Sequence, residues 1–224
     1  MRWLAVLCLV MSCQAQALTA RSWLITDTDL NVQSGYNYRE LRSIASLTKL
    51  LTVMVAIDDG TARPELVKLA MVNSNNHAAT QLCKNYSRGY QACIRAMNEK
   101  AMRLDAWNTY LYDSTGLDRR NRSTAQDIAR IVLAARNYAQ IVESSHILRD
   151  RKKKMVLKNT NPLVGTFNTT VSKTGWTMAA GGCIAVLIEN RIYVLLGSHN
   201  TKTRVTELAQ LVRAEGVEPS KLGF

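Results

Sequence analysis

Hydrophobic and polar positions alternate differently along three parts of the chain. Residues 22–37 hold two short apolar runs around an Asp-rich turn, which predicts two strands. The middle of the chain has helical spacing, and strand-like runs return after residue 150. The strands expected there are 169–176, 181–189 and 191–200, and the expected helices are 46–58, 64–72, 77–86, 91–104, 125–138 and 203–216.

Strands at both ends and helices between them favour an α+β fold. In such a fold, both ends of the chain would build one antiparallel sheet, and helices would flank it. The central helices would form a helical subdomain. A chain of 224 residues with 47% hydrophobic and 21% charged residues has a globular composition, and it suits one domain of this kind.

The first residues predict export. Arg2 is followed by an apolar run over 3–10 and by a small-residue cleavage pattern ending at Ala17, which is typical of a secretory signal. The run is too short to span a membrane. We expect residues 1–17 to be a signal peptide and 18–224 to form the exported, periplasmic domain. A second interpretation is a lipobox, which would place a lipid on Cys13.

The charge of the chain indicates an anionic partner. The formal net charge is +12, which would suit nucleic acid, membrane headgroups or an acidic polymer. Export argues against nucleic acid and favours a carboxylate-rich envelope polymer. The basic run at 149–154 is interpreted as a solvated segment.

An exported chain would lie in an oxidising compartment, where a pair of cysteines tends to form a disulfide. Signal cleavage would remove Cys8 and Cys13. Cys83 and Cys93 flank a turn between two expected helices and either form a disulfide or remain two buried thiols. Cys183 lies in an apolar strand, where packing is its expected role. No cysteine–histidine spacing predicts a metal site, and we expect no cofactor.

Three short motifs carry the candidate chemistry. Ser46 and Lys49 are separated by one helical turn and would share a face, although a serine there could simply cap the helix. A second motif is Ser74-Asn75-Asn76, and the third is Lys173-Thr174-Gly175. The order S-x-x-K, S-x-N, K-T-G is the combination found in penicillin-binding proteins and class A β-lactamases.

The first catalytic interpretation concerns proton transfer. A serine hydroxyl attacks well only when a base takes its proton, and Ser46 is the expected nucleophile. Lys49 is the expected base if burial and a neighbouring cation, Lys173, keep its amine neutral. Ser74 would relay a proton to the leaving amine.

The second interpretation concerns substrate binding. Asn76 would hold a substrate amide, while Lys173 and Thr174 would bind a terminal carboxylate. Gly175 would let the substrate lie close to the strand. Trp176 would lie near the substrate, although it could also just pack on the strand, and its N–H would join that of the nucleophile in an oxyanion hole.

Longer stretches of the chain resemble one family. The segments are 42–58, 72–82, 92–104, 113–131, 159–164 and 172–183. They are similar to the small D-alanyl-D-alanine peptidases, in particular to the endopeptidase branch of the low-molecular-mass penicillin-binding proteins. The resemblance implies an acyl-enzyme mechanism on peptidoglycan stem peptides and crosslinks, with β-lactams as covalent inhibitors. It also implies the serine β-lactamase/DD-peptidase-like fold, with the site beside the helical subdomain.

The chain departs from this family pattern at two places. Only a short segment separates Lys49 from Ser74, where family members carry an extra strand and loop, so substrate preference stays open. Carboxypeptidase relatives often continue into a β-rich domain and a membrane anchor, whereas this sequence stops at Phe224. That difference favours the endopeptidase branch and an exported protein with no transmembrane anchor.

Several alternatives remain beside this interpretation. A carboxypeptidase that trims terminal D-alanine is the main one, and a slow wall-binding protein is another. A β-lactamase is disfavoured because no E-x-x-L-N stretch follows Ser74. The three histidines, His77, His146 and His199, are isolated, although His77 could line the cleft. Asp113, Asp118 and Asn121 are expected to brace their loop.

Overall fold

The computed structural model describes residues 17–150 and 156–219. The expected signal peptide, including the alternative lipid site at Cys13, therefore lies outside the described residues, apart from Ala17. Most of the basic run at 149–154 lies outside them as well. None of the helices in the described parts of the chain is long and apolar enough to cross a membrane.

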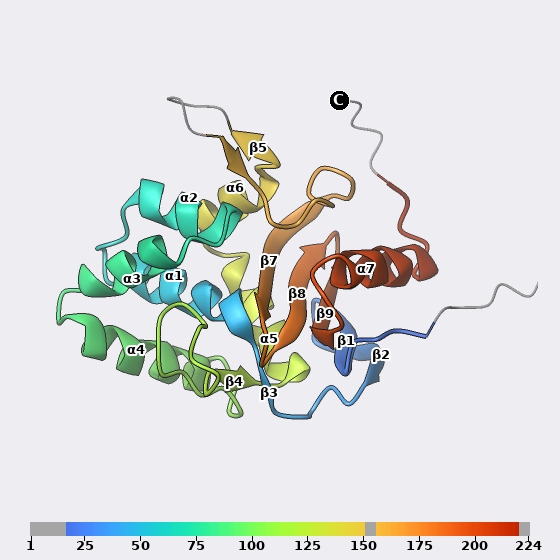
Figure 1. The fold of residues 1–224 in the computed structure, drawn as a ribbon, viewed down its shortest axis with the longest axis horizontal. Coiled ribbons are helices and arrows are strands. Elements are labelled where there is room, and N and C mark those ends of the chain that lie inside the picture. The colour runs from blue at the N-terminus through green and yellow to red at the C-terminus, as the bar shows by residue number, and fades with distance from the viewer. Residues whose placement is uncertain (1–16, 151–155, 220–224) are drawn as a thin grey trace, which may run out of the picture.

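A five-stranded antiparallel sheet joins the two ends of the chain (Figure 1). Its order is β2-β1-β9-β8-β7. The strands are β1 (Ser22–Asp27), β2 (Val32–Tyr36), β7 (Thr169–Thr177), β8 (Gly181–Ile188) and β9 (Arg191–Ser198). The N-terminal strand β1 pairs with β9, in a register that places Trp23 opposite Leu195. The α+β architecture expected from the sequence is therefore confirmed.

The helices follow one another mainly between β2 and β7. They are α1 (Lys49–Asp58), α2 (Pro64–Val72), α3 (Asn76–Lys84), α4 (Tyr90–Arg103), α5 (Ala125–Ala135), α6 (Ala139–His146) and the C-terminal α7 (Thr203–Ala214). A single 3-10 turn, Ala45–Thr48, precedes α1. Short ladders add β3 (Arg42–Ser43) with β4 (Arg122–Ser123) and β5 (Arg149–Asp150) with β6 (Leu157–Lys158).

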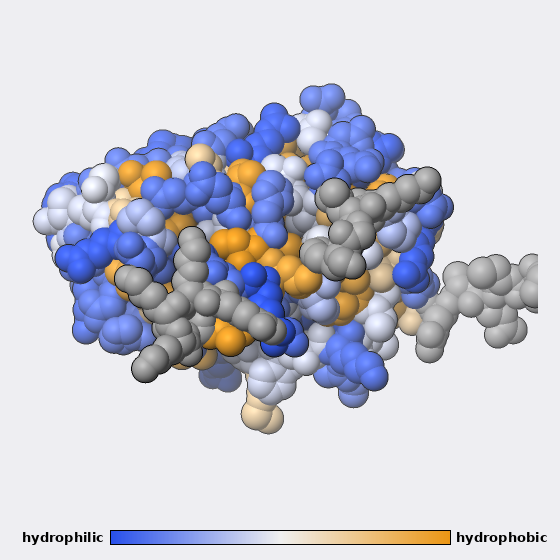
Figure 2. Space-filling view, turned by 90° about the horizontal axis from the view of Figure 1, so that it is seen from above, coloured by the Kyte–Doolittle hydropathy of each residue, from blue (hydrophilic) through white to orange (hydrophobic). Residues whose placement is uncertain are grey.

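Strands β8 and β9 are buried on both faces, which explains their nearly continuous apolar runs. On one face, Leu24 and Val194 join the core that contains α1 and α5. On the other face, Ile25 and Tyr193 pack with Leu208 from α7. Figure 1 shows α7 on one side of the sheet and the other helices opposite. From above, the surface is mainly hydrophilic, with hydrophobic residues gathered near the middle (Figure 2).

Two expected helices differ from the structure. The helix expected over 46–58 begins with the 3-10 turn, because Ala45 has a positive φ of 46° that no α-helix accommodates. The helix expected over 125–138 ends at Ala135, and α6 was not predicted at all. The backbone of Asn137 and Tyr138 turns back onto α5 through hydrogen bonds to residues 134 and 135. Because the apolar pattern continues across this turn, the break between α5 and α6 was not predicted from the sequence.

A disulfide joins two of the central helices. Cys83 in α3 is bonded to Cys93 in α4, with their Cα atoms 5.3 Å apart. A loop of this size is worth about 2–3 kcal/mol of the free energy of unfolding in the chain-entropy model. Cys183 is a free thiol and fully buried, and burial raises its pKa to about 11. It therefore stays protonated, as expected for a packing residue.

Candidate active site

Ser46 and Lys49 meet at the start of α1. Ser46 lies in the 3-10 turn, and the Lys49 side chain is completely buried one turn later. The Lys49 Nζ atom lies 2.8 Å from Ser46 Oγ, 2.8 Å from Asn76 Oδ1 and 2.6 Å from the Thr115 carbonyl oxygen. All three partners are neutral. The serine does not cap α1, since Thr48 occupies the cap position and no side chain bonds there.

Burial controls the protonation of Lys49. Loss of solvation lowers the pKa of this amine to about 7, and the carboxylate of Asp113 opposes the shift. A large fraction of the amine is therefore neutral near pH 7 and can accept a proton from the adjacent hydroxyl. The sequence-based interpretation assigned part of this effect to Lys173. Burial is the cause that lowers the pKa of Lys49, and repulsion between the two lysine cations lowers the pKa of Lys173.

Two glycines allow the backbone of the nucleophile to pack closely. A Cβ atom on Gly175 would lie 2.7 Å from the Ser46 nitrogen, and one on Gly116 would lie 1.9 Å from the Ala45 carbonyl oxygen. Ala45 itself has a positive φ, a conformation that costs a non-glycine residue about 1–3 kcal/mol. The Ser46 amide donates no hydrogen bond to the residues that the structure describes. Its N–H is thus available to a ligand.

Residues 74–76 connect α2 to α3, and each has a different partner. Ser74 has a φ of 60°, and its Oγ accepts a hydrogen bond of 2.9 Å from Lys173 Nζ. Asn75 caps α3 by accepting from the Ala78 amide at 2.8 Å. Asn76 is the first residue of α3, and its side-chain amide oxygen, Oδ1, accepts a hydrogen bond from Lys49 Nζ. The S-x-N motif therefore reaches both lysines.

The strand β7 supplies the third motif. Lys173 is 1% exposed, and its Nζ donates to Ser74 Oγ and to the Thr174 carbonyl oxygen, each at 2.9 Å. Burial lowers the pKa of Lys173, and the cations of Lys49 and Arg204 lower it further. Trp176, two residues after Thr174, is half exposed at the rim.

Three participants were not foreseen from the sequence. Thr174 Oγ1 donates to Thr160 Oγ1 at 2.6 Å, and the Arg204 guanidinium donates to the carbonyl oxygen of Gly175. The third is the carbonyl of Thr115, which holds Lys49. Thr160 belongs to the stretch 159–164 that resembles the family, so a signal existed for it. A backbone carbonyl and an arginine on the distant helix α7 give no sequence signal.

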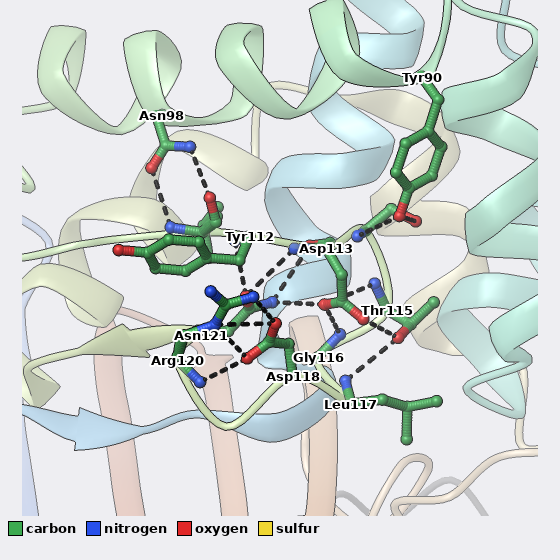
Figure 3. Close-up of polar contacts among 12 residues, drawn as sticks. Tyr90, Asn98, Tyr112, Asp113, Thr115, Gly116, Leu117, Asp118, Arg120 and Asn121 are labelled. Carbon is green, nitrogen blue, oxygen red and sulfur yellow. Dashed lines mark hydrogen bonds and ion pairs between the residues drawn. The ribbon is translucent and has the colours of Figure 1, made fainter.

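Hydrogen bonds among its own residues hold the loop over residues 113–121 together (Figure 3). The Asp113 carboxylate accepts from the Gly116 amide at 2.8 Å and from Asn121 Nδ2 at 2.7 Å. Asn121 also donates to Thr48 Oγ1 at 3.1 Å, which ties the loop to the turn that carries the serine. Asp118 pairs with Arg120 at 2.6 Å. The bracing role expected for these polar side chains is confirmed.

The hydrogen bonds described above around Lys49 and Lys173 involve no histidine. His77, His146 and His199 are exposed, and His77 follows Asn76 on the first turn of α3. Within residues 17–150 and 156–219, no group of three histidine, cysteine or acidic side chains is placed to hold a metal ion. The arrangement around Ser46 instead suits acyl transfer by a serine and an amine.

Sequence comparison supplies the family. The model of the peptidase S11 family, described as D-alanyl-D-alanine carboxypeptidase, matches residues 58–195. The chain belongs to this family. The match starts after Ser46 and Lys49, so the roles of these two residues depend on the geometry above.

The matches to individual relatives cover more of this chain than the family model does. The D-alanyl-D-alanine endopeptidase of Escherichia coli K12 is 31% identical over 219 residues, which cover 80% of this chain and 71% of the relative. The D-alanyl-D-alanine endopeptidase of Pseudomonas aeruginosa is also 31% identical, over 76% of this chain and 67% of the relative. A carboxypeptidase of Bacillus subtilis, DacF, is 23% identical, over 86% of this chain and 61% of its own length.

Solved structures confirm the fold. Penicillin-binding protein D2 of Listeria monocytogenes, in its ampicillin-bound form, has a TM-score of 0.79 and 20% identity, with 88% of this chain and 97% of that chain covered. Penicillin-binding protein 6B of Escherichia coli gives a TM-score of 0.77 at 23% identity, with 91% and 79% covered. The chain therefore has the DD-peptidase fold.

Proposed function

We propose that this member of the D-alanyl-D-alanine peptidase family hydrolyses D-alanine-containing crosslinks of peptidoglycan through an acyl-enzyme on Ser46. One observation carries the proposal. The Ser46 hydroxyl lies 2.8 Å from an amine, on Lys49, whose pKa is about 7. A neutral base at hydrogen-bond distance can take the hydroxyl proton as the oxygen attacks, an effect typically worth about 10²–10⁴ in rate.

Acylation would proceed in two proton transfers. Ser46 Oγ attacks the D-alanine carbonyl carbon of the scissile bond while Lys49 accepts the hydroxyl proton. The oxyanion is bound by the N–H groups of Ser46 and Trp176. In the second transfer, the protonated Lys49 returns this proton through the hydroxyl of Ser74, held by the Lys173 amine, to the leaving amine. The C–N bond breaks to leave an ester on Ser46, and Lys49 is neutral again. A water molecule then attacks the ester and gives a proton to the neutral Lys49, which passes it to Ser46 Oγ as the ester C–O bond breaks and the acid leaves.

The remaining site residues would orient the substrate. The Asn76 side chain binds the peptide amide, because its oxygen accepts from Lys49 while its NH₂ group has no partner among the described residues. Lys173 and Thr174 bind the carboxylate beyond the scissile bond. Gly175 gives the substrate backbone room along β7, and Trp176 covers it from the rim. β-Lactams would acylate Ser46 in the same way, and the ampicillin-bound relative from Listeria supports this part of the proposal.

Crosslink cleavage is favoured over trimming of free stem peptides. The two relatives that reach 31% identity are both named endopeptidases, whereas the carboxypeptidase DacF has 23% identity. A carboxypeptidase acting on the same D-alanyl-D-alanine bond remains the second candidate, and the family description supports it. A slow wall-binding protein is disfavoured, because the Lys49 amine lies 2.8 Å from the Ser46 hydroxyl, a distance that suits a base and its nucleophile.

Export completes the proposal. We infer that residues 1–17 are removed as a signal peptide and that residues 18–224 act in the periplasm as one peptidase domain. The charge pattern of the first 17 residues supports this, as does the Cys83–Cys93 bond, which an oxidising compartment maintains. N-terminal sequencing of the protein recovered from the periplasm is the test, and a start at Leu18 is expected.

Two measurements test the activity. Fluorescent penicillin should label the protein covalently, and Ser46→Ala should lose the label, since no other hydroxyl lies against Lys49 among the described residues. Labelling that persists in Ser46→Ala would remove this serine from the mechanism. Mass spectrometry of digested crosslinked muropeptides then separates the candidates. Dimers converted to monomers identify an endopeptidase, and loss of one terminal alanine identifies a carboxypeptidase.

A further inference from the structure

The loop that supports Ser46 has a second, outward face with its own pocket. The pocket is open, has a volume of about 660 Å³, and is lined by Leu41, Tyr110, Tyr112, Arg119, Arg120 and Arg122. We name it the tyrosine–arginine pocket. No residue proposed above for catalysis or substrate binding lines it.

Its side chains present aromatic faces and positive charge together. Tyr110 and Tyr112 are 48% and 51% exposed. The Arg120 guanidinium stacks on Tyr112, 4.4 Å from the ring centroid, and pairs with Asp118 (Figure 3). One arginine is thus held in place against an aromatic ring.

The other two arginines are available to a ligand. Arg119 and Arg122 are exposed and form no ion pair in the described parts of the chain. Guanidinium groups bind carboxylates through paired hydrogen bonds, and aromatic rings stack on sugar rings and flat amides. The chemistry of the pocket therefore suits an anionic ligand that also carries rings or amides.

The backbone connects this pocket to the nucleophile. Tyr110 and Arg122 exchange two hydrogen bonds of 2.9 Å, and Arg122 pairs with Ser43 in the β3–β4 ladder. The chain then runs directly from Ser43 to Ser46. On the inner side of the same loop, the Thr115 carbonyl holds Lys49. A ligand in the pocket would therefore lie on the outer side of a loop whose inner side forms part of the candidate active site.

We propose that the tyrosine–arginine pocket binds a carboxylate-bearing glycopeptide segment of the same peptidoglycan polymer, next to the crosslink being cleaved. The inference rests on the proposed function. A polymeric substrate extends beyond the cleft, carries free carboxylates and sugar rings, and meets a chain with a net charge of +12. The pocket would increase affinity for polymer and leave chemistry on short peptides unchanged.

The test compares polymer with a short substrate. In Arg119→Glu/Arg122→Glu, cleavage of isolated crosslinked sacculi should fall at least tenfold in kcat/KM. Cleavage of a short D-alanyl-D-alanine peptide, and acylation by fluorescent penicillin, should stay within twofold of the wild type. Tyr112→Ala should show the same selectivity without a change of charge. Added salt should weaken the wild type on sacculi more than the double variant.

A matched control separates the pocket from overall charge. Lys202→Glu/Arg213→Glu makes the same change in net charge at exposed positions of α7 and of the residue before it. This variant should cleave sacculi nearly as the wild type does. An equal loss in both double variants would overturn the proposal in favour of nonspecific attraction, and so would an unchanged Arg119→Glu/Arg122→Glu variant.

Failure of the proposed function would give a different result. A wild type that penicillin does not label and that cleaves neither substrate refutes the peptidase mechanism. Co-sedimentation of the protein with sacculi still tests the pocket in that case. Selective loss of sedimentation in Arg119→Glu/Arg122→Glu, against the α7 control, supports it, and equal sedimentation of both variants overturns it.

Discussion

Lys49 and Lys173 are both buried in the candidate active site, yet their surroundings give them different chemistry. Lys49 is surrounded by three neutral acceptors and lies near the carboxylate of Asp113. Lys173 has a hydroxyl, Ser74 Oγ, and a backbone carbonyl as partners, and its charged neighbours are both cations. Within the described residues, no acid contributes to the pKa shift of Lys173.

The difference fits the roles proposed for the two lysines, Lys49 as a base and Lys173 as an anion binder. Lys49 can lose a proton to solvent near neutral pH, and its neutral amine can then accept a proton from a serine hydroxyl. Lys173 lacks a counter-ion, and a bound substrate carboxylate would provide one, raising its pKa as the ligand enters. The two amines are connected through Ser74-Asn75-Asn76, which contacts both.

The largest expected effect comes from arginine at position 49. Arginine keeps its charge at any pH the protein tolerates, so Lys49→Arg should lower the rate of acylation by penicillin about 10²–10⁴-fold. Stopped-flow labelling measures this rate. Circular dichroism should show an intact fold, and Lys173→Arg is the matched control, because a cation suffices there. Normal acylation by a folded Lys49→Arg would show that another group is the base.

Removal of the second amine should affect binding more than the acylation step. Lys173→Ala removes a charged hydrogen-bond donor worth about 1.5–3 kcal/mol, so kcat/KM on a peptide with a free terminal carboxylate should fall about 10–100-fold. The same peptide with an amidated terminus should lose much less. Steady-state kinetics on the two peptides measures the contrast. An equal loss on both would contradict a role in carboxylate binding.

The pH dependence should report Lys49. The base acts when neutral, and its pKa is about 7. The acylation rate should therefore rise with pH through about 7 and level off above, with about a tenfold loss at one pH unit below the midpoint. Penicillin labelling at short times over a pH series measures this. Asp113→Asn should move the midpoint down, because the carboxylate raises this pKa. A flat profile would argue against lysine as the base.

The smallest expected effect concerns Thr160. Thr160→Val removes the acceptor of the Thr174 hydroxyl, a bond of 2.6 Å, while nearly keeping the side-chain volume. A neutral hydrogen bond is worth about 0.5–1.5 kcal/mol, so kcat/KM should fall about 2–10-fold, mainly through KM. Rescue by Thr160→Ser would assign the effect to the hydroxyl. A larger fall in kcat than in KM would place Thr160 closer to the chemistry.

The sheet and most helices could be predicted because their signals are local. Strands β8 and β9 are apolar runs around a tight turn, and α2 begins at a proline. The break between α5 and α6 was missed, since apolar spacing continues across it. The 3-10 turn at Ala45 was also missed, because its strained backbone follows from the packing of Gly116 and Gly175, which lie far away in sequence.

The sequence could predict which side chains form the site, but it could predict less about the burial and the backbone contacts that surround them. Ser46, Lys49, Ser74 and Lys173 were chosen from ordered motifs, and the structure brings their polar atoms within hydrogen-bond distance as two pairs. The cause of the lowered pKa of Lys49 depends on burial, which no motif encodes. Contacts through a backbone carbonyl, as at residue 115, are equally invisible, because any residue type could make them.

The connection between α2 and α3 also limits how this chain can change in length. Ser74, Asn75 and Asn76 follow one another in the chain, and they contact the Lys173 amine, the Ala78 amide and the Lys49 amine, respectively. Deleting or inserting one residue here would point each side chain toward the partner of the adjacent residue. A shift of register would therefore preserve none of the three contacts. Insertions should be tolerated in the turn after α1 and not in this connection.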